Sequence, residues 1–261
     1  MIDWGSWLNQ PILLGGFVIL GWAYALASGP LRPGLAPGIP FPRKSAVRFH
    51  CGLGILVLAL GSPLDGMART FLCSAQTVQD LLVLYPAAAL LLSGLPGWMV
   101  DPVLGRLPRP VGRTLLGPVV CGAFFVIIVS GWYVPRPFEA ALGNGAVRSL
   151  RAIAYLAAAL LFWWPLLSPS RIFPPLRYGA RLLYLFGIEV ALTGVFTYIL
   201  MADHAMYPTY AHAPRLIAAL TPAEDQVLAG VLLSFFSSVV LVGALGLNFF
   251  RWARSDAKPL K

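Results

Sequence analysis

Apolar runs of about 20 residues recur along the whole chain, and short segments rich in proline, glycine and basic residues separate them. This pattern predicts an all-α polytopic membrane protein. No segment between the runs is long enough for a soluble domain, so we expect one transmembrane domain over residues 1–261. Seven membrane-spanning helices are predicted: Pro11–Ser28, Phe49–Gly61, Ala75–Leu95, Leu115–Tyr133, Ile153–Leu167, Leu182–Met201 and Val227–Phe250. The second run is short, so a membrane-spanning helix there has to extend into the flanking residues.

The first apolar run resembles a signal peptide, because Ala25-Leu26-Ala27 is similar to a cleavage site. Residues 1–10, however, contain Asp3 and no lysine or arginine, so the basic segment that precedes the apolar part of a signal peptide is missing. We therefore expect the first run to be a retained span.

Composition agrees with a membrane protein, since 58% of the residues are hydrophobic and 11% are charged, against about 25% charged in a soluble domain. The net charge is +9, but the basic residues lie between apolar runs and form no patch for nucleic acid. We expect the lipid bilayer to be their partner. The three cysteines lie in or beside different runs, which excludes a disulfide framework or a CxxC motif.

The basic residues are unevenly divided between the two sides of the predicted bundle. One set of segments holds 14 of them and the other holds five, namely Arg69, Arg136, Arg148, Arg151 and Arg215. The side richer in basic residues is cytoplasmic in most membrane proteins. We therefore expect an outer N-terminus, a cytoplasmic C-terminus and a location in a bacterial inner membrane.

This orientation gathers polar residues at the outer face. The loops 62–75, 134–152 and 202–225 lie there together, and within the third span Gln76 and Asp80 are spaced four residues apart, on one helix face. The polar layer predicted from this comprises Asp65, Gln76, Gln79, Asp80, Arg148, Arg151, Asp203, Asp225 and Gln226. A buried carboxylate must be paired or protonated, so we hypothesise that Asp80 pairs with Arg148 or Arg151. A proton or ligand role and simple solvent exposure are the alternatives.

Glu189 lies near the middle of the sixth span, where an acid is by default a functional candidate. The structural alternative is a protonated side chain that hydrogen-bonds another helix of this protein or of a partner. At the start of the last span, Thr221 and Glu224 form the pattern of a helix capping box.

Metal binding has weak candidates at the outer edge, where thioether and imidazole groups could hold copper(I). These residues are Met201, His204, Met206 and His212. Met201 could equally be the last lipid-facing residue of its span, and both histidines could be ordinary loop residues. The tyrosines of the same loops, Tyr198, Tyr207 and Tyr210, and the pair Trp163-Trp164 are interpreted as interfacial anchors.

Other seven-span functions need residues that the chain lacks. The lysines lie outside the spans, which excludes a retinal Schiff base, and the three histidines near span ends give no intramembrane haem pair. No nucleophile is paired with a base, and we expect no enzyme activity.

Six stretches together resemble the CtaG family, seven-helix membrane proteins linked to assembly of the caa-type cytochrome c oxidase. The similarity covers roughly residues 50–250. The stretches are Ser62-Pro63-Leu64-Asp65, Ser74-Ala75 with Gln79, Leu161-Phe162-Trp163-Trp164-Pro165, Ala180-Arg181-Leu182-Leu183-Tyr184-Leu185, Met206-Tyr207-Pro208-Thr209-Tyr210 and Glu224-Asp225-Gln226-Val227-Leu228-Ala229-Gly230.

The resemblance implies a role in building an oxidase, including a supply of copper to its catalytic subunit. Family members typically carry two His-x-x-x-His pairs at the starts of the third and fifth spans. The corresponding positions here are Gln76 with Asp80 and Arg148 with Ala152, and neither Arg148 nor Ala152 can ligate a metal. Two functions follow as hypotheses: an assembly factor for cytochrome c oxidase, or a non-catalytic accessory subunit bound to a respiratory or other membrane complex.

Overall fold

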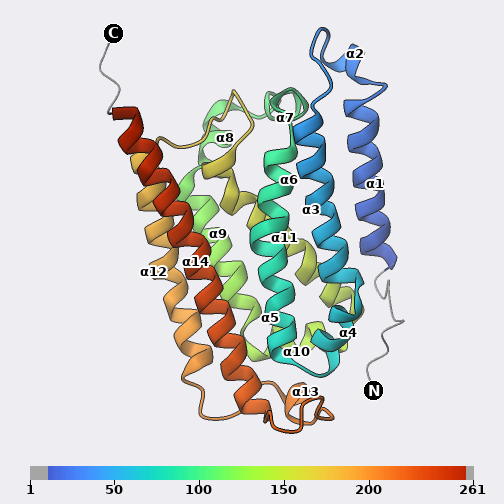
Figure 1. Ribbon diagram of the computed structural model, residues 1–261, viewed down its shortest axis with the longest axis vertical. Coiled ribbons are helices and arrows are strands. Elements are labelled where there is room, and N and C mark those ends of the chain that lie inside the picture. The colour runs from blue at the N-terminus through green and yellow to red at the C-terminus, as the bar shows by residue number, and fades with distance from the viewer. Residues whose placement is uncertain (1–10, 257–261) are drawn as a thin grey trace.

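The computed structural model describes residues 11–256, and in that range it contains helices and connecting loops without β-strands (Figure 1). Five of the described helical segments are long and apolar enough to cross a membrane. They are α3 (Arg43–Gly61), the segment Cys73–Gly94, α11 (Gly145–Leu167), α12 (Tyr178–Leu200) and α14 (Pro222–Asp256). The predicted fold class, an all-helical protein that crosses the membrane several times, is thereby confirmed.

Three further helices lie at the places of the first and fourth predicted spans. The helix α1 (Pro11–Ser28) is apolar but shorter than the five, and α8 (Arg109–Leu115) with α9 (Pro118–Trp132) makes a sixth candidate span if the pair, bent by 43°, is counted as one. The count of seven crossings and the orientation stay predictions. Asp3, Lys258 and Lys261, which entered the sequence argument, lie outside the described residues.

Two helix starts differ from the prediction. The helix α11 begins at Gly145 rather than Ile153, because the Asn144 side chain accepts hydrogen bonds from the backbone N–H groups of Ala146 (2.8 Å) and Val147 (3.3 Å) and so caps an earlier turn. Pro118 has no N–H with which to continue α8, so α9 begins there and the chain bends. The predicted capping box is confirmed, since Thr221 and Glu224 exchange hydrogen bonds at the start of α14.

The third span is not a uniform α-helix. It consists of α5 (Cys73–Leu82), the π-helical turn η1 (Val83–Ala87) and α6 (Ala88–Gly94). Pro86 lies inside η1 and cannot donate a backbone hydrogen bond, and the turn widens around it. The indole N–H of Trp163 on α11 donates to the Leu84 carbonyl at 3.0 Å and ties the widened turn to the neighbouring helix.

The long helices stand roughly side by side, with α5, α6 and α11 in the middle, α12 and α14 along one edge and α1 at the other edge beside α3 (Figure 1). Short helices close the two ends of the bundle. One end, which we call the α4 end, carries α4 (Pro63–Thr70), α10 (Pro135–Gly143) and α13 (Pro208–Ala211). The other, the α7 end, carries α2 (Arg32–Leu35), α7 (Gly97–Leu104) and α8.

The helices α3 and α6 pack closely because glycines face the partner backbone. A Cβ atom on Gly94 would lie 2.5 Å from the Phe49 backbone nitrogen, and one on Gly52 would lie 2.9 Å from the Leu91 nitrogen. Small residues at such contacts let membrane helices approach each other. In the adjacent layer, Tyr24 of α1 stacks on Phe49 with ring centroids 4.1 Å apart and donates to the Gly94 carbonyl at 2.9 Å.

Gly94→Ala should therefore lower the free energy of unfolding by roughly 1–3 kcal/mol, because backbone rather than a movable side chain has to give way. Gly54→Ala on the neighbouring helix is the matched control, since nothing lies within 4 Å of the added methyl group. Thermal unfolding in mild detergent compares the two. Equal stability of the two variants would show that α3 and α6 are not held as closely as described.

Candidate functional site

A cluster of buried polar side chains lies where α4, α5 and α11 meet at the α4 end. The side chains come from far-apart segments, yet none is more than 7% exposed. We call this cluster the polar core: Asp65, Gln76, Gln79, Asp80, Arg148 and Arg151. Helical spacing explains the convergence, because the members on α5 are three or four residues apart and those on α11 are three apart, so each helix directs its polar side chains to one side.

Asp80 is held by three donors. Arg151 Nη2 lies 2.6 Å from Oδ2 in a buried ion pair, the Tyr133 hydroxyl donates to the same oxygen at 3.1 Å, and Gln76 Nε2 donates to Oδ1 at 3.1 Å. The predicted pairing of Asp80 with one of the two arginines is confirmed. Both oxygens of this carboxylate are therefore already occupied by hydrogen bonds from the protein.

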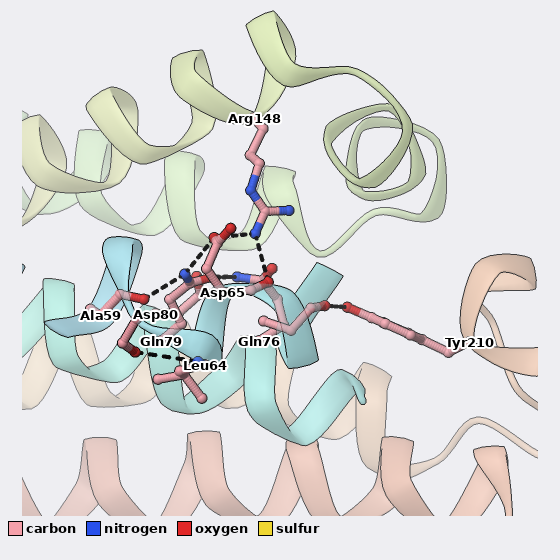
Figure 2. A network of polar contacts seen from close by, with 10 residues as sticks. Ala59, Leu64, Asp65, Gln76, Gln79, Asp80, Arg148 and Tyr210 are labelled. Atoms are coloured by element: carbon pink, nitrogen blue, oxygen red, sulfur yellow. Dashed lines mark hydrogen bonds and ion pairs between the residues drawn. The ribbon is translucent and has the colours of Figure 1, made fainter. Parts of the chain in front are cut away.

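A second ion pair joins Asp65 to Arg148, whose Nη2 contacts Oδ1 and also donates to the Asp65 carbonyl at 3.3 Å (Figure 2). Gln79 Nε2 donates to the same carboxylate at 3.0 Å and to the Ala59 carbonyl at 2.7 Å. Sequence reasoning placed Asp65 in the layer without giving it a partner. The available signal was charge balance, since two arginines that enter a membrane helix bundle need two acids.

The two pairs are linked through Gln76, which donates to Gln79 at 3.0 Å as well as to Asp80. The polar core thus forms one connected network in which two positive and two negative charges cancel. Buried charges are tolerated when they are paired and hydrogen-bonded in this way, and removing one partner is costly. The network fastens α4, α5 and α11 to one another.

Aromatic rings cover the polar core. The Arg151 guanidinium carbon lies 4.7 Å from the Tyr155 ring centroid and 5.4 Å from that of Phe138, which is favourable for a desolvated cation. Tyr207 stacks on Phe138 with centroids 4.0 Å apart, and its hydroxyl donates to the Tyr133 carbonyl at 2.8 Å. The rings exclude water from the ion pairs and so strengthen them.

The interpretation of the aromatic residues as interfacial anchors is wrong for most of them. Tyr207 and Tyr210 are 1% and 3% exposed, and Trp163 and Trp164 are also buried, whereas Tyr198 is exposed. The loop tyrosines turn inward because their hydroxyls find backbone carbonyls, that of Tyr210 on Ala68 and that of Tyr207 on Tyr133. Burial raises the pKa of both hydroxyls above their ordinary values, so they stay protonated and act as donors.

Asp225 and Gln226 bind backbone rather than the polar core. The Asp225 carboxylate accepts hydrogen bonds from the Cys73 N–H at 2.6 Å, from the Ser74 N–H and from the Ser74 hydroxyl. It thus caps the start of α5 from α14, a helix far away in the sequence. Gln226 accepts from the Met206 N–H at 2.7 Å and donates to the His204 carbonyl at 3.3 Å. Asp203 is exposed in the same loop. The start of α14 therefore holds both α5 and the 201–207 loop.

Glu189 lies half-buried on α12 and accepts a hydrogen bond from the Ser238 hydroxyl of α14. The expected hydrogen bond to another helix is confirmed, and the partner belongs to the same chain, whereas the protonated state of Glu189 stays a prediction. It thus joins the two helices along one edge of the bundle.

The four positions at which the family resemblance implies histidines do not fit a metal. Gln76 and Asp80 direct their side chains into the polar core, Arg148 supplies a cation, and Ala152 offers no donor atom. A guanidinium group beside the site would repel a copper ion, and Asp80 is already bound by Arg151. Two of the four positions, Asp80 and Arg148, are thus occupied by members of ion pairs.

Most of the weak copper candidates lie at the surface. Met201 is 74% exposed, His204 and His212 are exposed, and His212 Nδ1 lies 2.8 Å from the Pro208 carbonyl. Within residues 11–256, no group of three or more histidine, cysteine, aspartate or glutamate residues is placed to hold a metal ion. The assignment of copper to Met201, His204, Met206 and His212 stays a prediction.

Comparison with protein families matches the chain to the model described as cytochrome c oxidase caa3 assembly factor, over residues 22–255. Neither the curated proteins nor the solved structures contain a significant match. The matched range includes the polar core, the aromatic cover and the Asp225 cap, and it extends over most of the chain. With a matching helical membrane fold and the same family expected from its motifs, this chain belongs to the cytochrome c oxidase caa3 assembly factor family.

Proposed function

We propose that this protein assists the assembly of a cytochrome c oxidase as a non-catalytic membrane factor that carries no metal of its own. The family supports the oxidase as the partner. The observation that carries the metal-free part is that Asp80 and Arg148, at two of the four positions where the resemblance implies histidines, are paired with Arg151 and Asp65. Copper delivery through those positions would need donor atoms that Arg148 and Ala152 lack.

The proposal includes an orientation in which the chain crosses the membrane seven times as one domain, in a bacterial inner membrane, with its N-terminus outside. The α4 end, with the polar core and the neighbouring loops, then faces the periplasm and is the surface that contacts the oxidase. The concentration of basic residues in the segments at the α7 end supports this orientation.

The orientation can be tested with single cysteines in a Cys51→Ser background, since Cys51 is exposed while Cys73 and Cys121 are buried. Arg215→Cys lies in the loop before α14 and Arg113→Cys lies in α8, and both positions are exposed. We expect a membrane-impermeant maleimide to label Arg215→Cys in intact spheroplasts and Arg113→Cys only after lysis. The reverse pattern would invert the topology and place the polar core on the cytoplasmic side.

The assembly role can be tested by deleting the gene and measuring assembled oxidase by its haem absorption and subunit content. We expect a loss of oxidase that added copper does not rescue, together with a purified protein whose copper content equals that of an unrelated membrane protein prepared alongside. Rescue by copper, or stoichiometric copper that disappears in His204→Ala and Met206→Ala, would overturn the metal-free proposal.

A permanent accessory subunit is the second candidate, and the replacement of the histidine positions by ion pairs favours it, because a structural subunit needs no copper chemistry. The two functions differ in stoichiometry. An assembly factor should be present in small and variable amounts in purified mature oxidase, whereas an accessory subunit should co-purify in constant ratio with the other subunits.

A further inference from the structure

A second feature of the molecule lies at the opposite end from the polar core. A cavity of about 500 Å³ opens between α1, α6, α7 and α11, with α2 at its mouth. Its lining is almost entirely hydrocarbon, contributed by residues such as Leu20, Ala23, Leu91, Trp98, Val103 and Leu156. None of these residues takes part in the polar core.

The cavity is open to the bilayer along one side. Leu20 and Val103, which line it, are 43% and 63% exposed, and Leu35 at its mouth is 57% exposed. Its back wall is closed, because Tyr24 is buried and its hydroxyl donates to the Gly94 carbonyl. A hydrocarbon chain can therefore enter sideways from the membrane and meets no unpaired hydroxyl at Tyr24.

The depth of the cavity suits one leaflet. Leu20 is eight residues from the end of α1 at Ser28, which corresponds to about 12 Å along the helix axis. Half of the hydrocarbon core of a bilayer is about 15 Å thick. An acyl chain that entered at the level of α2 and α7 would thus be accommodated over most of its length.

Basic residues lie close in sequence to cavity residues at the mouth. Arg32 lies one helical turn before Leu35 on α2, and the Arg106 N–H donates to the carbonyl of the cavity residue Val103. Residues 29–48 contain four basic residues and no acidic one. Neither arginine forms an ion pair with another described residue. The nearby acid Asp101 already accepts hydrogen bonds from Ser170 and from the Arg171 N–H.

We propose that this cavity binds one acyl chain of an acidic phospholipid, whose phosphate is held by Arg32 and Arg106. The apolar lining, the depth of one leaflet and the unpaired arginines at the mouth together match a molecule with a hydrocarbon tail and an anionic headgroup. Neutral lipids share the tail but gain nothing from the arginines. Bound lipid would fix α1, which packs mainly on α3 and otherwise borders the cavity.

The test is native mass spectrometry of the full chain in detergent, titrated with phosphatidylglycerol or with phosphatidylcholine of the same acyl chains. We expect tighter binding of phosphatidylglycerol. The double variant Arg32→Gln/Arg106→Gln should weaken it by roughly tenfold or more, since each basic residue near anionic lipid contributes about 1 kcal/mol. Arg254→Gln, in the last turn of α14 at the far edge of the bundle, is the matched control and should bind as the unaltered protein does.

Filling the cavity gives an independent test. Ala23→Trp places a large ring in the opening, whereas Leu26→Trp adds the same ring on an exposed face of α1 outside the cavity. We expect only Ala23→Trp to abolish phosphatidylglycerol binding. Equal affinity for the two lipids, unchanged binding in the arginine double variant, or equal loss in both tryptophan variants would overturn the proposal. Arg106 is exposed and Arg32 is half-buried, and neither forms an ion pair, so the double variant keeps the test decisive even if Ala23→Trp does not fold.

Discussion

Replacing Arg151 with methionine should lower the free energy of unfolding by about 3–5 kcal/mol, the largest single-residue effect that the structure implies. Arg151 is 7% exposed and lies 2.6 Å from the Asp80 carboxylate. Without it, Asp80 keeps only the hydrogen bonds from Tyr133 and Gln76 and becomes a buried charge without a counter-ion. Equilibrium unfolding in mixed micelles, followed by circular dichroism, measures the loss.

Two matched variants separate the ion pair from a general effect of arginine loss. Arg69→Met removes an exposed arginine in α4 and should change stability by less than about 0.5 kcal/mol. The double variant Asp80→Leu/Arg151→Met should recover most of the stability, because an apolar pair of similar volume often replaces a buried ion pair without loss. A double variant as unstable as Arg151→Met alone would mean that the two side chains do not act as a pair.

The same double variant also bears on function. If the polar core only holds α4, α5 and α11 together, a stable Asp80→Leu/Arg151→Met protein should still support oxidase assembly in the deletion strain. If the charges themselves contact the oxidase or move a proton, assembly should fail although the protein is folded and present. Oxidase content at equal protein level therefore distinguishes a structural role of the pair from a direct one.

Local patterns in the sequence were sufficient to predict one of the two ion pairs of the polar core. Gln76 and Asp80 share a helix face by spacing alone, and the cost of a buried charge requires a cation nearby, which predicts the contact with an arginine of the fifth span. The apolar runs likewise located a helix for every predicted span. These inferences rest on helix geometry and on the membrane as solvent, neither of which depends on how the loops are folded.

The other half depends on tertiary contacts that no local pattern encodes. Asp65 meets Arg148 only because α4 folds back against α5, after the Ser62 hydroxyl accepts from the Leu64 N–H and begins that helix. The burial of Tyr207 and Tyr210 likewise requires the 201–213 loop to fold inward. From the sequence, tyrosines in a loop beside a span had suggested anchors at the membrane–water interface. The early start of α11 could have been predicted, since Asn144 is a good helix cap, but the arginines that follow interrupt the apolar run.

The family resemblance and the residues of this chain lead to different expectations at the same positions. The fold and the match over residues 22–255 agree with an oxidase assembly factor, while two of the four positions expected to hold histidines, Asp80 and Arg148, belong to buried ion pairs. A helix bundle can be held at these positions without a metal ion, because the two ion pairs join α4, α5 and α11. Gln76 donates hydrogen bonds to Asp80 and Gln79 and so links the two ion pairs into one network.

Replacing Asp225 with alanine should lower the free energy of unfolding by about 3 kcal/mol, because buried backbone donors at the start of α5 lose their acceptor. Asp225 is 3% exposed, and its carboxylate accepts from the N–H groups of Cys73 and Ser74 and from the Ser74 hydroxyl. Its negative charge also lies at the positive end of the α5 dipole. No residue next to α5 in sequence supplies a side-chain cap.

The control for Asp225→Ala is Asp203→Ala, which removes an exposed acid from the loop before α14 and should change stability by less than about 0.5 kcal/mol. Asp225→Asn keeps one acceptor oxygen and should fall between the two. Faster hydrogen exchange at the Cys73 and Ser74 amides should accompany the loss in Asp225→Ala, with slow exchange retained in Asp203→Ala.

Since α5 carries Gln76 and Asp80 within its first two turns, a frayed start would also loosen the polar core. Asp225→Ala should therefore reduce the further cost of Arg151→Met, and strictly additive losses in the double variant would show that the cap and the ion pairs are independent.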